Sequence, residues 1–169
     1  MKMVAVLVLL FASVASAQTV FPVTSEYGKK ANGSFLIQNN TILPQAVTIE
    51  AYNFFIDKTG RHNRKLDSTT HIQLSETSMR MGPKETHEIS YRIKCDVLPC
   101  EVLIKSGMTV GHTQGDKDHP VFQVRLWLDH VVYICPKAKG CQSGIIEAAG
   151  YKGPIIPAAT NGKVASPAK

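Results

Sequence analysis

The chain has few charged residues, few aromatic residues and no convincing helical pattern. Of its 169 residues, 19% are charged and 7% are aromatic, with one tryptophan and four cysteines. The cysteine fraction is too low for a small protein built from disulfides alone, and 44% hydrophobic residues are too many for a disordered chain. A chain of this length forms one domain with short appendages, which excludes a multidomain enzyme.

The sequence also lacks the motifs of common enzyme classes. It has no glycine-rich nucleotide-binding loop and no Gly-x-Ser-x-Gly element. One polar segment gathers residue types that bind metals or transfer protons. Its members are His112, Asp116, Asp118 and His119. They follow no recognised ligand spacing, and a solvated loop explains them equally well. We therefore expect a protein that is not an enzyme, with no catalytic residue, no metal and no cofactor.

Only one long apolar run is present, and it lies at the N-terminus. Met1, Lys2 and Met3 precede it, and small residues end it at Ala17. This order is typical of a secretory signal peptide, residues 1–17. The run is shorter than the about 20 residues of a membrane-spanning helix. We expect an exported protein of the periplasm, with secretion as the alternative and no transmembrane segment after cleavage.

The charge of +6 raises the question of an anionic partner. Export argues against nucleic acid, and the lysines are scattered along the chain. The basic balance is therefore expected to serve solubility or loose binding to the cell envelope, with no nucleic acid as partner.

An oxidising compartment predicts that the four cysteines form disulfides. Four cysteines allow three pairings. The short segments 95–100 and 135–141, each with a turn-forming Pro or Gly, favour the local bridges Cys95 to Cys100 and Cys135 to Cys141. Long-range bridges and a metal site are the alternatives, although zinc sites prefer cysteines about two to four residues apart.

Alternation of apolar and polar residues with a period of two predicts strands. The pattern is clear in Ala46–Phe55 and Glu88–Lys94 and strongest in Phe122–Asp129, whereas Asp57–Ser68 is typical of a turn or loop. About seven short strands separated by turn signals predict an all-β protein, an immunoglobulin-like β-sandwich. Residues 137–169 have no strong pattern and predict a flexible C-terminal tail.

The order of the segments resembles the N-terminal immunoglobulin-like domain of the PapD-like periplasmic pilus chaperones. The pieces that carry the resemblance are Phe35–Asn40, Gln45–Asn53, Met81–Thr86, Glu101–Ile104 and Val121–Pro136. They predict one domain of this type over residues 18–136. The resemblance implies a chaperone that assists pilus (fimbrium) biogenesis or cell wall organisation through protein–protein interaction.

In that family the last strand of the first domain supplies alternating apolar side chains to an incomplete pilus subunit, which is donor-strand complementation. Position by position, the resemblance assigns this client-binding role to Phe122, Val124, Leu126 and Leu128. The same alternation is also typical of a strand that faces its own core. A structural or adhesive module of the cell envelope, with these residues buried, is therefore the alternative function.

Two features depart from the family. Its members bind the subunit's terminal carboxylate with basic residues on the first and last strands. Here Phe21–Glu26 contains none, and Asp129, His130 and Val131 lie at the matching positions of the last strand. Substitutes are available in Lys29, Lys30 or Arg125.

The second departure is one of length. The 33 residues after Pro136 are too few for a second immunoglobulin-like domain of about 100 residues. The expectation is a single-domain relative whose partners are a pilus or surface subunit and, in a further arrangement, a second chaperone-like chain.

Overall fold

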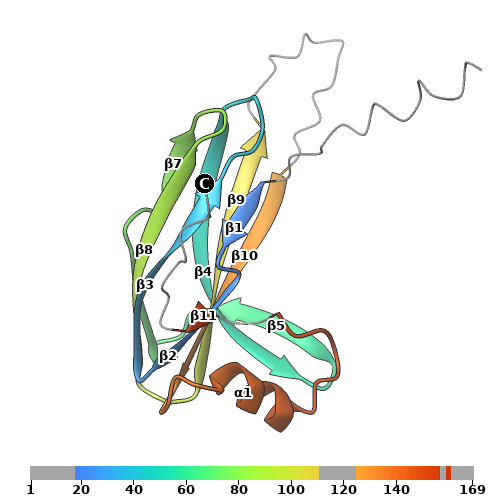
Figure 1. Ribbon diagram of the computed structural model, residues 1–169. Helices are drawn as coiled ribbons and strands as arrows, with labels where there is room; N and C mark the ends of the chain where they lie inside the picture. The colour runs from blue at the N-terminus through green and yellow to red at the C-terminus, as the bar shows by residue number, and fades with distance from the viewer. Residues whose placement is uncertain (1–17, 111–124, 157–158, 161–169) are drawn as a thin grey trace, which may run out of the picture.

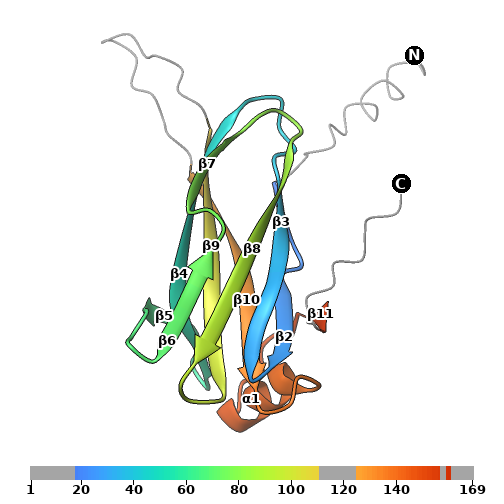
Figure 2. The ribbon, with the colours of Figure 1, turned by 90° about the vertical axis from the view of Figure 1, so that its left-hand side faces the viewer.

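A computed structural model describes residues 18–110, 125–156 and 159–160, and they form a two-layered β-sandwich with one short helix (Figures 1 and 2). The predicted immunoglobulin-like sandwich is confirmed. The described residues contain eleven strands rather than about seven.

The smaller sheet has four strands in the spatial order β1 (Thr19–Phe21), β3 (Lys30–Gln38), β8 (Thr86–Cys95) and β6 (Thr70–Leu74). The larger sheet runs in the order β11 (Ala159–Thr160), β2 (Thr24–Gly28), β10 (Arg125–Cys135), β9 (Cys100–Val110), β4 (Gln45–Asp57) and β5 (Gly60–Lys65), and β7 (Ser78–Met81) also pairs with β4. Neighbours are antiparallel except for β2, which is parallel to both β10 and β11.

The main core lies between the sheets. In β8 the predicted alternation is present, since Ile89, Tyr91 and Ile93 are buried while the residues between them are exposed. They pack against side chains of the larger sheet such as Ile104 and Ile134. A period of two places all these side chains on inward faces, so burial of apolar surface stabilises the pairing of the sheets.

A second, smaller core lies on the outer face of the larger sheet, under α1 (Cys141–Ala149). Ile146 of the helix packs with Leu103 and Tyr133 of the sheet. The expected flexible tail is therefore wrong for this part of residues 137–169. A nine-residue helix has little stability of its own, so packing and a covalent link decide its formation.

Two disulfides join neighbouring cysteines, as the spacing favoured. Cys95 is bonded to Cys100 across the turn between β8 and β9. Cys135 is bonded to Cys141, which connects the end of β10 to the first residue of α1.

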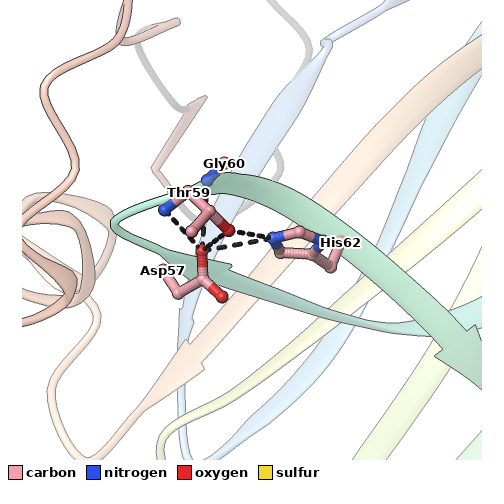
Figure 3. Close-up of polar contacts among 4 residues, drawn as sticks. All are labelled: Asp57, Thr59, Gly60 and His62. Carbon is pink, nitrogen blue, oxygen red and sulfur yellow. Dashed lines mark hydrogen bonds and ion pairs between the residues drawn. The ribbon is translucent and has the colours of Figure 1, made fainter.

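The segment Asp57–Ser68, expected to be a turn or loop, contains β5, which forms a hairpin with β4. One carboxylate oxygen of Asp57 accepts hydrogen bonds from the backbone N–H of Thr59 at 2.7 Å, from its hydroxyl at 2.5 Å and from the N–H of Gly60 at 3.1 Å, and it lies 3.2 Å from Nε2 of His62 (Figure 3). The hydroxyl of Thr59, and then its N–H, lower the pKa of Asp57 to about 2. A side-chain-capped turn therefore closes a hairpin whose β5 residues are mostly exposed.

Glu26 should stabilise α1, since its carboxylate accepts a hydrogen bond at 2.7 Å from the backbone N–H of Gln142 in the first turn. Glu26 is 7% exposed, and the helix has no acidic residue of its own in that turn. Glu26→Ala should lower the free energy of unfolding by about 1 kcal/mol or more in urea titrations. Glu147→Ala, at an exposed position of the same helix, is the control; an equal loss in both variants would show that the cap contributes nothing.

Candidate functional site

Strand β10 is paired on both sides only along its second half. β9 pairs with it from Arg125 to Ile134, whereas β2 pairs with it only from Val131 to Cys135. Within the described part of the chain, no strand pairs with the remaining side of Arg125–Asp129. We call this segment the open edge.

The backbone groups of the open edge can be assigned to a side. The N–H of Val131 donates to the carbonyl of Val23 at 2.8 Å, so Val131 presents its backbone groups toward β2. Backbone groups alternate between the two sides of a strand. Those of Arg125, Trp127 and Asp129 therefore point toward the unpaired side.

The edge is open because the N-terminal strand changes sheets. β1 pairs with β3 in the smaller sheet, and β2 pairs with β10 in the larger one. Pro22 lies between them, and because proline has no N–H, it cannot continue a ladder of hydrogen bonds. The strand that lies near the first half of β10 is β1, which belongs to the other sheet (Figure 1).

A buried chain of hydrogen bonds fixes this crossing. The carbonyl of Pro22 can only accept, so Nδ1 of His130 carries the proton and donates to it at 2.6 Å. In the neutral imidazole, Nε2 is then an acceptor for the hydroxyl of Tyr91 at 3.1 Å, and the Tyr91 oxygen in turn accepts from the hydroxyl of Tyr27 at 2.9 Å. The ring of His130 also stacks on Phe35 with centroids 4.8 Å apart.

Burial determines the protonation of this network. His130 is fully buried, and desolvation lowers its pKa to about 4. Desolvation likewise raises the pKa of Tyr91 well above its ordinary value. The imidazole is therefore neutral at physiological pH, as its two hydrogen bonds require.

The four residues assigned to client binding lie in different surroundings or outside the described part of the chain. Phe122 and Val124 lie outside the described residues. Leu126 is 38% exposed, while Leu128 is half-buried and packs against the main core. The structure thus leaves Leu126 on the surface beside the open edge and places Leu128 against the protein's own core.

Other apolar side chains near the open edge were not predicted as site residues. Phe21 and Val23 flank the crossing and are 49% and 37% exposed. Trp127, the chain's one tryptophan, is 37% exposed on the outer face, where Gly107 leaves room for its ring. The guanidinium of Arg125 lies 4.4 Å from the centroid of that ring, and Arg125 also donates to the hydroxyl of Thr48. The only sequence signal for Trp127 was its place in the strongest alternating run.

The candidate basic substitutes are separated. Arg125 lies at the start of the open edge. The backbone N–H of Lys29 bonds to the carbonyl of Cys135, and Lys30 pairs with Lys94 in the smaller sheet, so neither residue pairs with the open edge.

The polar segment with His112, Asp116, Asp118 and His119 lies outside the described residues. Among the residues that are described, no group of three or more potential ligand side chains is placed to hold a metal ion. In the same residues, no helix is long and apolar enough to cross a membrane.

The buried imidazole predicts that stability falls in mild acid. Its folded-state pKa of about 4 lies below the ordinary 6.5, so between these values the unfolded chain binds a proton that the folded chain excludes. The contribution of His130 is complete above about pH 6.5 and decreases by up to about 3 kcal/mol as the pH falls through 4.

Glu101 acts in the opposite direction, because burial raises its pKa from 4.5 to about 7 and favours the folded state as the pH falls. Urea unfolding should therefore be measured in a Glu101→Gln background, where stability should decline between pH 7 and pH 4.5. Adding His130→Asn should remove that decline while lowering stability at pH 7. An NMR titration of the folded protein in which His130 protonates near 6.5 would contradict the prediction.

The fold resembles solved structures of fimbrial chaperones. The class 5 fimbriae chaperone CfaA matches with a TM-score of 0.51 at 7% identity, covering 72% of this chain and 57% of that one. A structure of a chaperone–tip adhesin complex of CFA/I fimbriae biogenesis matches with a TM-score of 0.50 at 8% identity, covering 72% and 56%. The CsuC–CsuE chaperone–tip adhesion subunit complex from Csu pili of Acinetobacter baumannii is 15% identical over 72% and 52%, with a TM-score of 0.46.

The chain spans a little over half the length of these matched chains. No family model matches the sequence, and no curated protein matches it. The two structures with a TM-score of 0.50 or more are chaperone structures rather than enzymes. At such low identity, the likeness shows the fold: an immunoglobulin-like β-sandwich of the type found in the PapD-like pilus chaperones.

Proposed function

We propose that this protein binds a partner protein by strand addition at the open edge, as an exported chaperone-like protein that assists the assembly of a pilus or another surface structure. The observation that supports this most directly is that Arg125–Asp129 pairs with β9 on one side only within the described residues. An added strand would satisfy the backbone groups of Arg125, Trp127 and Asp129, and its side chains would contact the surrounding apolar surface.

The apolar surroundings of the open edge support a protein client. Phe21, Val23, Leu126 and Trp127 are all more than a third exposed. An unpaired edge with such neighbours is prone to aggregate, so it needs an occupant. Leu126, together with Phe122 and Val124, is proposed as the donor set, while Leu128 serves the protein's own core.

The proposed location is the periplasm, after removal of residues 1–17. Two disulfides support an oxidising compartment. The proposed client is a pilus or surface subunit, and a second chaperone-like chain would be needed if a cleft between two domains is used. The alternative is a structural or adhesive module of the envelope, which the packing of Leu128 against the core favours.

Leu126→Asp separates the two functions. Because Leu126 is 38% exposed, the charge should cost about 1 kcal/mol or less of stability, yet it should weaken client binding at least about tenfold. Val97→Asp, at a 66% exposed position outside β10, is the matched control and should retain binding. Affinity is measured with the client co-purified from the native envelope.

Amide hydrogen exchange then identifies the mode of binding. Strand addition should slow exchange at Arg125, Trp127 and Asp129, whose N–H groups face the unpaired side. Emission from Trp127 should shift to shorter wavelength as the edge is covered. If Leu126→Asp unfolds the protein, or if client binding leaves these three amides exchanging at their free rates, the strand-addition function is wrong.

A further inference from the structure

A cavity of about 760 Å³ lies on the outer face of the smaller sheet, where β3, β8 and β6 run side by side (Figure 2). Its walls carry the positively charged side chains of Lys30, Arg92 and Lys94, with the imidazole of His71 beside them. We call it the cationic groove and define it by these four residues. The open edge belongs to the other sheet, so the two surfaces are separate.

Strand register concentrates charge in the cationic groove. Lys30 of β3 lies directly opposite Lys94 of β8, and His71 of β6 lies opposite Lys94 on its other side. Directly opposed side chains have Cβ atoms about 5 Å apart, and like charges in that position are destabilising. Arg92 is on the same face of β8, two residues or about 7 Å from Lys94.

Carboxylates within the chain neutralise only part of this charge. Asp96 lies 3.9 Å from the ammonium of Lys94 and 3.5 Å from Nε2 of His71. Among the described residues, Lys30 and Arg92 form no ion pair. An anionic ligand would therefore remove a repulsion that the fold retains.

The remaining lining indicates what kind of anion fits. Asn32 and Gln73 lie directly opposite Arg92 on its two sides, and their amides can bond to peptide groups. Leu66 adds half-buried apolar surface. A bare polyanion needs only the cations, whereas a peptide uses all three kinds of contact.

We propose that the cationic groove binds an extended acidic segment of a partner protein, with carboxylates at alternate positions. In an extended chain, residues two apart on one face are about 7 Å apart, which is the spacing of Arg92 and Lys94 along β8. Each carboxylate then meets one cation, with charge-assisted hydrogen bonds to the guanidinium and ammonium. The partner binds here independently of any strand added at the open edge.

The test uses a fluorescently labelled ten-residue peptide of alternating glutamate and threonine with blocked ends, followed by anisotropy. The double variant Arg92→Gln, Lys94→Gln should weaken binding at least about tenfold, and added salt should weaken binding to the unaltered protein. The control Lys137→Gln, Lys139→Gln removes the same charge from exposed positions outside the cationic groove and should change affinity less than about twofold.

Lys30→Glu separates loss of binding from loss of folding. It places a carboxylate opposite Lys94, so the melting temperature should rise while peptide affinity falls. The proposal is overturned if Lys30→Glu binds the peptide as well as the unaltered protein, or if a glutamine–threonine peptide binds as tightly. It is equally overturned if both double variants lose affinity alike, or if inorganic polyphosphate binds more tightly than the peptide.

Discussion

The hydrogen bond from the imidazole of His130 to the carbonyl of Pro22 holds the point at which the N-terminal strand leaves one sheet and joins the other. A proline carbonyl at such a crossing has no ladder partner, and burying it unpaired would be costly. The neutral imidazole supplies that donor, and its Nε2 accepts a hydrogen bond from the hydroxyl of Tyr91 in the opposite sheet. The satisfied network thus allows β1 and β2 to lie in different sheets, and the open edge exists only because they do.

The two candidate binding surfaces use different physical forces. The open edge offers unpaired backbone groups surrounded by exposed apolar side chains, so its interaction is short-ranged and depends on the register of an added strand. The cationic groove offers charge from opposed Lys30 and Lys94, which acts over a longer range and weakens with salt. Because the surfaces lie on different sheets, a partner can occupy one without competing for the other.

Strands with a strong two-residue period were predictable, and elements held by their surroundings were not. Ile89, Tyr91 and Ile93 are buried as their alternation indicates. In a half-buried strand, the alternation of apolar and polar residues by itself shows which face points inward. The hairpin strand β5 is charged and mostly exposed, so its pairing with β4 leaves no apolar pattern. Helix α1 is short, and its N-terminus depends on Cys135 and on Glu26, which are distant from it in sequence or lie outside the helix.

Leu126 and Leu128 show the difference between what the sequence determines and what only the tertiary structure determines. By itself, the sequence determined that they lie on the same face of one strand, because side chains two apart in a strand point the same way. It also determined which cysteines were close enough to pair locally. Only the tertiary structure decided that Leu128 packs against the main core while Leu126 is exposed, and that one half of β10 is covered by β2. The burial of a residue depends on which neighbouring elements pack against it, and along β10 these are β1 and β2, whose positions the crossing at Pro22 determines.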